Sequence, residues 1–152
     1  MGKSEKQMEK ERERNQRIID TAFRLFVERK IEAVSMDEVA KAAGVGRATL
    51  FRCYSNKTEL TIAVCASKWK AYLDRLDETR PITSIHDIPA IERFIFTLDS
   101  YIGMYRNHKD LLQYNDNFNN YITHQTVQEK ELENFHASLS SVNTRLHMMY
   151  AK

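Results

Sequence analysis

Glycine, hydroxyl, aromatic and basic side chains are concentrated in one short stretch of the sequence. Residues 44–57 read GVGRATLFRCYSNK, and they include Gly44 and Gly46, two of the four glycines in the chain. Glycines in this spacing before basic residues are typical of two anion-binding segments. One is a loop that surrounds the phosphates of a nucleotide, and the other is a turn that directs a helix toward nucleic acid.

A nucleotide-binding loop requires either GxGxxG after a strand or GxxxxGK[ST]. The run GVGRAT has no third glycine, and no glycine precedes the pair Lys57-Thr58. The preceding segment, MDEVAKAA, has the apolar spacing of a helix and not of a strand. These differences exclude the nucleotide loop.

A helix-turn-helix unit makes stricter demands, and this region meets them. Ala40 supplies a small side chain where two helices come close, and Gly44 can end the first helix with a positive φ angle. The sequence predicts one short helix over MDEVAKAA and a second from about Gly46 or Arg47 to about Tyr54. Apolar side chains expected to point inward are Val39, Ala43, Val45 and Leu50.

Capping residues mark the helix starts. Ser35 followed by Glu38 is a capping-box signature at the start of the first short helix. Ser55 or Asn56 can cap a long helix that continues to about Glu78.

Helical periodicity recurs along almost the whole chain, which favours an all-α fold. We expect an N-terminal three-helix helix-turn-helix DNA-binding domain, joined by a long helix to a C-terminal helical bundle. Both interior prolines, Pro81 and Pro89, lie in RPITSIHDIP, which is the expected joint between the two parts.

Composition and charge fit this reading. Of the 152 residues, 42% are hydrophobic and 29% are charged, which is typical of a soluble globular protein. No apolar run approaches the roughly 18 residues that span a bilayer, and MGKSEKQMEKERERNQ has no apolar core of a secretory signal. We therefore expect a cytoplasmic protein with no membrane partner. Residues 1–57 carry 13 Lys and Arg against 9 Asp and Glu, whereas residues 58–152 carry 10 against 12, which suggests an anionic partner for the first third.

The stretch SMDEVAKAAGVGRATLFRCYSNKTEL resembles the N-terminal DNA-binding domain of the TetR family of bacterial transcriptional regulators. The pattern AxxAGV followed by TLFxxYSNKxEL carries the resemblance, and IIDTAFRLFVERKIEAVSM is similar to the family's first helix and its lead-in. Together they cover roughly residues 15–65. The resemblance implies a bacterial, homodimeric repressor that binds double-stranded palindromic operator DNA and responds to an unknown small-molecule effector.

The expected organisation follows the family. Residues 1–14 are a charged flexible arm, 15–58 the helix-turn-helix DNA-binding domain, 59–79 the connecting helix, and 80–152 a helical ligand-binding and dimerisation domain. Family members generally run longer and dimerise through two further C-terminal helices, whereas this chain ends at Lys152. Either the heptad seam from Leu132 to Met149 takes over dimerisation, or the chain is truncated or reduced.

The expected DNA-reading residues lie on the second short helix. Arg47 can pair with guanine and Ala48 can contact a thymine methyl group, while Thr49 and Arg52 suit phosphate oxygens. Phe51 stands where the family usually has tyrosine and keeps the ring without the hydroxyl group.

The neighbouring helix starts supply the other candidates. Gly46 leaves room for backbone amides to approach a phosphate. The backbone amides of Ser35 and Met36 can likewise contact the DNA backbone. Ser35 can equally serve only as a helix cap. Lys57 opposes the helix dipole unless an anion is close. The resemblance implies that this anion is a phosphate.

Aromatic side chains beyond residue 80 are candidates for an effector pocket, although such stripes are also typical of ordinary core. Residues 91–105 place apolar side chains on one helical face as well. The pocket candidates are Phe94, Tyr101, Tyr105, Phe118 and Tyr121.

Other chemistry finds little support. Glu133 and His136 form one Glu-x-x-His pair, whereas di-metal sites of helical bundles need two. We expect no enzyme, metal or cofactor. Two alternatives stay open: an adaptor whose C-terminal bundle binds a protein, and a redox sensor that uses Cys53, where the family usually has histidine or tyrosine. The effector, the operator, the target genes and the choice of repression over activation are not specified by the sequence.

Overall fold

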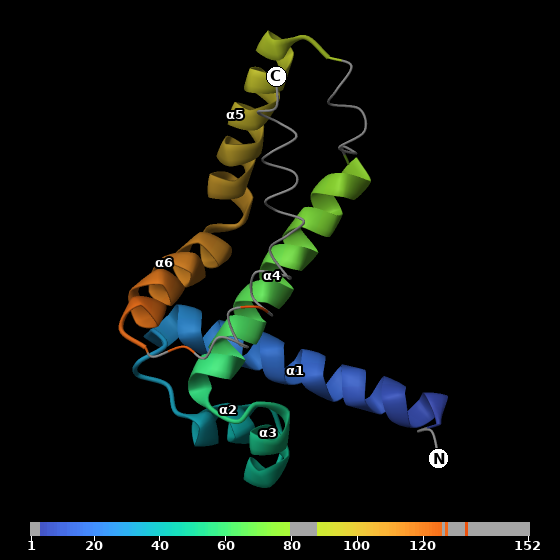
Figure 1. Ribbon diagram of the computed structural model, residues 1–152, viewed down its shortest axis with the longest axis vertical. Helices are drawn as coiled ribbons and strands as arrows, with labels where there is room; N and C mark the ends of the chain where they lie inside the picture. Colours follow the sequence, from blue (N-terminus) through green and yellow to red (C-terminus); the bar gives the residue numbers. More distant parts are fainter. Residues whose placement is uncertain (1–3, 80–87, 126, 128–132, 134–152) are drawn as a thin grey trace.

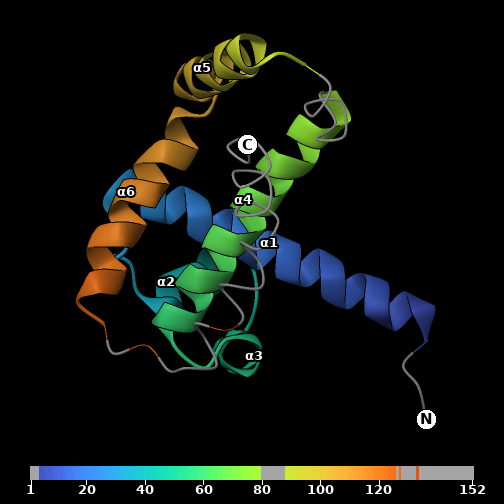
Figure 2. The same ribbon diagram turned by 45° about the horizontal axis from the view of Figure 1, so that its top comes forward.

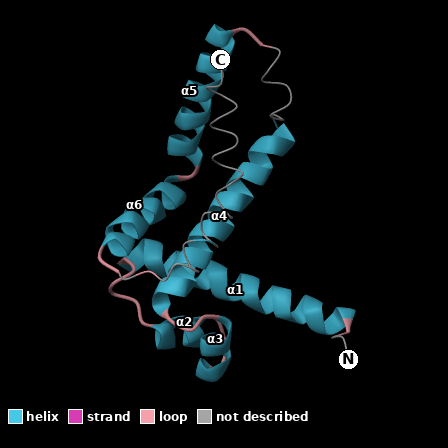
Figure 3. Ribbon diagram, viewed as in Figure 1, coloured by secondary structure: helices cyan, strands magenta, loops and turns pink. Residues whose placement is uncertain are grey.

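The computed structural model describes residues 4–79, 88–125, 127 and 133. Within them the chain forms six α-helices and no strand, which confirms the all-α prediction for this part (Figures 1 and 3). The expected joint at residues 80–87 and the heptad positions from Leu132 to Met149 lie outside the described residues. The helices are α1 (Glu5–Arg29), α2 (Met36–Ala42), α3 (Arg47–Cys53), α4 (Lys57–Thr79), α5 (Ala90–Asn107) and α6 (Lys109–Thr123).

The arrangement separates α3 from α5. Helices α2 and α3 lie beside the start of α4 at one end of the molecule, and α5 lies toward the other end (Figures 1 and 2). Helix α6 returns from α5 to contact both α1 and α4. None of the helices in the described part of the chain is long and apolar enough to cross a membrane.

Helix α1 begins earlier than expected. The flexible arm expected at residues 1–14 is corrected for residues 5–14, which form the first turns of α1, while residues 1–3 lie outside the described part. The backbone N–H of Ser4 donates to Oε1 of Gln7 at 3.1 Å, as at a capped helix start. The sequence that follows is rich in Glu, Lys, Arg and Gln, which are strong helix formers.

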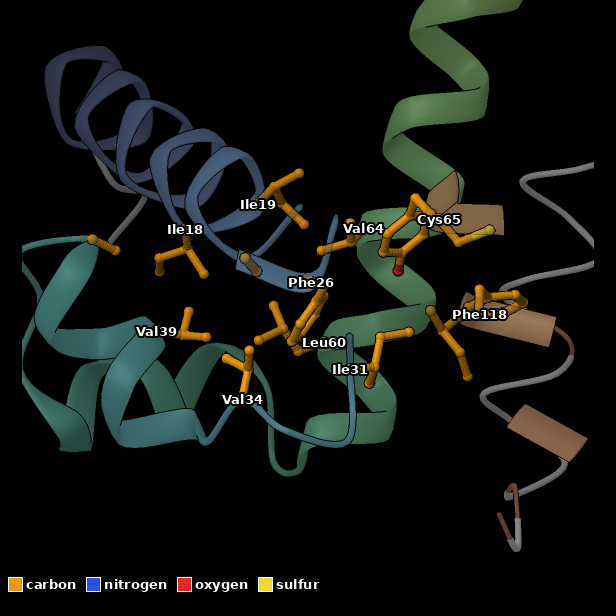
Figure 4. Packing of buried hydrophobic residues seen from close by; sticks show 14 of the residues in the cluster. Ile18, Ile19, Phe26, Ile31, Val34, Val39, Leu60, Val64, Cys65 and Phe118 are labelled. Carbon is orange, nitrogen blue, oxygen red and sulfur yellow. The ribbon is translucent and has the colours of Figure 1, made fainter. Parts of the chain in front are cut away.

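The core is one hydrophobic cluster that includes residues of α1 to α4 and of α6 (Figure 4). It therefore crosses the boundary expected near residue 80, because α6 packs on the same side chains that hold the N-terminal helices together. Its buried members include Ile18, Phe26, Ile31, Val34, Val39, Leu50, Leu60, Val64, Tyr114 and Phe118.

Tyr114 is the central side chain of α6 and is fully buried. Its ring centroid lies 5.3 Å from that of Phe23 and 6.4 Å from that of Phe26 on α1. Its hydroxyl donates a hydrogen bond of 2.7 Å to the carbonyl of Thr61 on α4. Burial raises the pKa of the Tyr114 hydroxyl well above its usual value. One aromatic residue thus joins three helices.

Two amide side chains of α6 bind the last carbonyls of α1. Nε2 of Gln113 donates to the carbonyl of Val27 at 3.0 Å, and Nδ2 of Asn117 donates to that of Phe26 at 3.3 Å. Carbonyls in the last turn of a helix have few partners within the helix. Helix α6 thus adds side-chain donors to the last turn of α1, beside the N–H of its C-cap residue Lys30, which also binds the Phe26 carbonyl.

One face of α5 differs from the core. Seven of its large apolar residues lie on one side of the helix, a pattern that predicts burial, yet they are 45–66% exposed. The opposite side of the helix provides the contacts, with Thr97 buried and Met104 packed against Tyr72, Leu73 and Leu111. We name the exposed set the α5 apolar face: Ile91, Phe94, Ile95, Leu98, Tyr101, Ile102 and Tyr105.

Tyr114→Phe tests the hydrogen bond between α6 and α4. We expect the free energy of unfolding to fall by about 1 kcal/mol, because a buried hydrogen bond contributes about that much net. Urea unfolding followed by circular dichroism measures it. Tyr105→Phe is the matched control, since Tyr105 is 66% exposed and should not change stability. If the two variants were equally stable, the Tyr114 hydroxyl would not stabilise the contact between α6 and α4.

Candidate nucleic-acid interface

The predicted capping box at the start of α2 is confirmed. The backbone N–H of Glu38 donates to Oγ of Ser35 at 3.2 Å, and that of Ser35 donates to Oε2 of Glu38 at 2.8 Å. Arg29 of α1 donates to Oε1 of Glu38 at 2.7 Å. The hydrogen bond from the Ser35 backbone, followed by that from Arg29, lowers the pKa of Glu38 to about 2. The hydroxyl of Ser35 is thus already engaged as a cap.

The turn between α2 and α3 uses its two glycines differently. Gly44 has a φ angle of 65°, a left-handed conformation that favours glycine. The N–H of Val45 then donates back to the carbonyl of Ala40 at 3.0 Å, which closes the turn. Gly46 is extended, with φ −69° and ψ 147°, and a Cβ there would meet only Oγ1 of Thr49 at 3.8 Å. Only Gly44 is required by the backbone, and Gly46 leaves the start of α3 open.

Helix α3 has a buried side and an exposed side. Leu50 is fully buried against Val39 and the rest of the core, as expected. On the other side Arg47, Ala48, Phe51 and Arg52 are exposed, and Thr49 is half-buried. Four of the side chains expected to contact DNA therefore occur together on one exposed face.

Arg47 is held loosely on this face. Its Nη1 lies 3.1 Å from Oδ2 of Asp37 on α2, and its guanidinium lies 5.4 Å from the centroid of the Phe51 ring. The two charged side chains are 71% and 59% exposed. Such an exposed ion pair contributes at most about 1 kcal/mol. An anionic partner can therefore replace Asp37 at little cost.

Residues 18–64 match the model of the tetR family of bacterial regulatory proteins. Residues 18–64 thus have the sequence features of the tetR family's N-terminal domain, and we call this segment the TetR-family domain. The matched segment runs from the buried part of α1 through α2 and α3 into the first turns of α4.

Curated relatives match part of the chain. An uncharacterized HTH-type transcriptional regulator of Mycobacterium tuberculosis is 47% identical over 47 residues, covering 31% of this chain and 23% of the relative. An HTH-type transcriptional regulator of Staphylococcus aureus is 31% identical over 68 residues, covering 45% of this chain and 37% of the relative. The matches thus span well under half the length of these curated relatives.

A solved structure has a similar fold over almost the whole chain. The fatty acid degradation regulator FadR from Bacillus halodurans superposes with a TM-score of 0.61, covering 98% of this chain and 68% of that chain. The sequence identity is 16%, so the likeness concerns the fold alone.

Lys57 has a different environment from the one expected. Its Nζ donates to the carbonyls of Ile31, Glu32 and Val34 at 3.0, 3.2 and 3.1 Å. An ammonium group has three N–H donors, so all three are engaged. The partial negative charges of three backbone carbonyls in the connection between α1 and α2 therefore take the place of the anion that a lysine at a helix start would otherwise favour. The phosphate role suggested by the resemblance finds no support in this geometry.

Two further cations, both on α1, bind backbone carbonyls. Nε of Arg17 donates to the carbonyl of Ala43 at 2.9 Å, and Nη2 of Arg29 donates to that of Ala33 at 3.1 Å. The sequence did not predict these two hydrogen bonds, because the carbonyls come close to the arginines only in the folded chain. Part of the positive charge of the first third therefore holds the domain together.

Met36 also packs inward. It is half-buried against the core cluster at the first position of α2. Neither Met36 nor Ser35 thus has a side chain free for DNA, and only their backbone groups stay candidates.

The five pocket candidates are not brought together. Phe94, Tyr101 and Tyr105 lie on the α5 apolar face, whereas Phe118 and Tyr121 are buried in the core. A cavity of about 190 Å³ lies elsewhere, between α4 and α5 near the start of α6. Its lining residues are Tyr72, Leu76, Thr79, Asp99, Ser100, Gly103, Asn107 and His108.

Metal-binding and thiol groups are sparse. Among the described residues no group of three or more His, Cys, Asp or Glu side chains is placed to hold a metal. Cys53 is half-buried and Cys65 is buried. Burial raises the pKa of the Cys65 thiol to about 12, so this thiol is unreactive at neutral pH.

Glu38→Gln should make the protein's stability less sensitive to acid. The folded pKa of about 2 lies below the usual 4.5, so the stabilisation by the carboxylate is complete above about pH 4.5 and is lost as the pH falls toward 2. Glutamine can keep the bond to the Ser35 N–H but carries no charge. Urea unfolding at several pH values should show the gap between wild type and variant closing with acid. A gap that does not change with pH would contradict this assignment.

Lys57→Met keeps an apolar stem and removes the ammonium group. We expect a loss of about 2 kcal/mol in the free energy of unfolding, because hydrogen bonds to charged groups contribute about 1.5–3 kcal/mol. Lys41→Met, at an exposed lysine of α2, should change stability by less than about 0.5 kcal/mol. Chemical denaturation measures both, and a Lys57→Met protein as stable as the control would rule out the inward role.

Proposed function

We propose that this chain is a DNA-binding transcriptional regulator that acts as a ligand-responsive repressor, bound as a homodimer to a palindromic operator. The observation that carries the proposal is the exposed face of α3, where Arg47, Ala48, Phe51 and Arg52 occur together opposite buried Leu50. The match of residues 18–64 to the tetR family supports it, as do relatives named HTH-type transcriptional regulators.

The side chains of this face have two roles: some contact bases, and others contact the sugar-phosphate backbone. Arg47 leaves Asp37 and pairs with O6 and N7 of a guanine, an arrangement that suits its forked guanidinium. Ala48 contacts a thymine methyl group, and Arg52 binds a phosphate oxygen, which positions the helix without reading sequence. The Phe51 ring beside Arg47 packs against sugar or thymine at the groove wall.

A homodimer matches the symmetry of such a site. Two copies related by a two-fold axis present two α3 helices to two half-sites, which lie about one helical turn or a multiple apart. A palindromic operator is the sequence counterpart of that symmetry.

The cavity between α4 and α5 is the proposed effector site. Asp99, Ser100, Asn107 and His108 give it polar groups, and its 190 Å³ suit a small polar molecule. Pockets for larger ligands are roughly 300–1,000 Å³, so a larger effector would have to widen it. A ligand releases DNA only if it binds the released conformation more tightly than the DNA-bound one.

Helix α6 provides the connection between that cavity and α3. His108 at its start lines the cavity, while Tyr114, Gln113 and Asn117 bind α4 and α1. A shift of α5 and α6 against α4 therefore moves α1, on which α2 packs, and α3 packs in turn on α2.

Of the two alternatives, the redox sensor has the weaker support. A disulfide switch needs a second reactive thiol, and the raised pKa of Cys65 removes the other cysteine from that role. The adaptor alternative has one observation in its favour, the α5 apolar face.

Fluorescence anisotropy with DNA from upstream of the protein's own gene tests the proposal. Arg47→Ala should weaken binding by about 1–3 kcal/mol and relax preference at one base pair, whereas Arg52→Ala should weaken binding to all sequences and reduce the salt slope by about 1. Lys41→Ala, on the exposed side of α2, is the charge-matched control. If neither arginine variant changes binding relative to this control, α3 is not the DNA-reading helix.

A further inference from the structure

Basic side chains form a regular row along the first turns of α1. Lys6, Lys10 and Arg14 are spaced by four residues, and Arg17 follows three residues later, so all four lie on one side of the helix. We name Lys6, Lys10 and Arg14 the α1 basic stripe. We infer that this stripe binds phosphates of duplex DNA beside the base pairs that α3 reads. This role rests on the proposed function, because it requires that α3 meets DNA.

The first turns of α1 are not held by the core. The first buried residue of the helix is Ile18, and the start of α1 extends away from the other described helices in both views (Figures 1 and 2). The match to the tetR family also begins at residue 18, so the stripe lies outside the matched segment. Core packing therefore does not account for the charge pattern of these turns.

Arg17 shows which way the row faces. Its Nε donates to the carbonyl of Ala43 at 2.9 Å, and Ala43 ends α2 directly before the turn to α3. The α1 basic stripe continues from Arg17 on the same side of the helix, which is the side of the α2–α3 turn. The 11 steps from Lys6 to Arg17 cover about 16 Å at about 1.5 Å per residue. That length corresponds to roughly five base pairs at about 3.4 Å each.

The charges of the stripe have no partner within the described part of the chain. Lys6 and Lys10 are exposed and Arg14 is half-buried. None of the three side chains forms an ion pair or a hydrogen bond with another described residue. The Nε of Arg14 is also shielded from solvent without an acceptor among these residues. A shielded donor without an acceptor is unfavourable, and a phosphate oxygen would supply the acceptor.

The spacing of the charges is unfavourable for a helix alone. Like charges four residues apart repel each other on a helix surface, whereas opposite charges at this spacing attract. The stripe contains two like pairs, because each of its members follows the previous one by four residues. Three acids at the same spacing form a separate row: Glu5, Glu9 and Glu13. An anion bound along the stripe would remove the repulsion within the basic row.

Duplex DNA is the anion that this pattern fits. Members of the stripe repeat every 6 Å or so along the helix axis, and DNA presents its phosphates at regular intervals along each strand. Helices that lie on anionic membranes have an apolar side beside their basic side. In α1, by contrast, the residues before Ile18 are polar except for Met8. The contacts would add affinity without reading sequence, as phosphate contacts do.

Lys10→Ala and Arg12→Ala test the stripe as a matched pair. Both residues are basic and exposed on the same turns of α1, but Arg12 lies outside the basic row. Lys10→Ala should weaken binding to all duplexes alike and should reduce the dependence of log affinity on log salt by about 1, because one phosphate contact is lost. Arg12→Ala should leave this salt slope unchanged. Fluorescence anisotropy at several salt concentrations measures both.

The triple variant Lys6→Ala, Lys10→Ala, Arg14→Ala removes the whole stripe. It should reduce the salt slope by about 3 and weaken binding at least about tenfold. Because alanine is the strongest helix former, the helical circular dichroism and the melting temperature should be kept. Hydroxyl-radical footprinting should show backbone protection up to about five base pairs beyond the α3 contacts in wild type, which the triple variant loses. An unchanged footprint and salt slope would overturn the inference, and so would a lowered melting temperature with an unchanged slope.

The α3 variants separate this inference from the proposed function. If Arg47→Ala and Arg52→Ala weaken DNA binding but the triple variant binds as wild type does, the regulator stands and the stripe is wrong. If the triple variant weakens binding to every duplex while both α3 variants bind as wild type does, the stripe stands and α3 is not the reading helix. A wild-type protein that binds no duplex DNA would overturn both.

Discussion

The Lys57 ammonium group fixes the part of the backbone on which the position of α3 depends. The connection between α1 and α2 has no regular structure of its own, so its carbonyl groups need donors from elsewhere. Lys57 binds three of them, and the connection then places Ile31 and Val34 in the core. Helix α2 starts directly after this connection and α3 packs on α2. A single cation at the start of α4 thus determines where the exposed face of α3 lies.

Other side chains stabilise the domain in the same way, by donating hydrogen bonds to backbone carbonyls at the ends of helices. Arg17 closes the end of α2, and Gln113 and Asn117 close the end of α1. These contacts join segments far apart in sequence through carbonyls at the ends of helices, where partners within the helix are few. The domain is therefore rigid where α3 is anchored. Its exposed charges, above all Arg47, are held only by weak surface pairs and can exchange partners.

The sequence was most informative where the physics is local. Ser35 with Glu38 and the positive φ angle of Gly44 follow from spacing within a few residues, and both occur as expected. Lys57 shows the limit of this reasoning: an unfavourable position predicts an anion nearby, but spacing cannot tell a phosphate from a carbonyl that lies 26 residues away in the chain. The apolar face of α5 shows a second limit. Periodicity predicts which side chains lie together, whereas their cover depends on the tertiary and quaternary arrangement.

The two exposed surfaces of this molecule have opposite physical character, which explains how they can coexist. The face of α3 is small and charged, and its contacts with an anion strengthen at low salt. The α5 apolar face is broad and neutral, and its contacts depend on the removal of apolar area from water, which salt screens little. Between them lies a core shared by α1, α4 and α6, with Tyr114 at its centre. Because α6 packs into that core and also contacts α5, a displacement of α5 that carried α6 with it would also move α1 and α4. A partner that displaced α5 would therefore also affect the exposed face of α3.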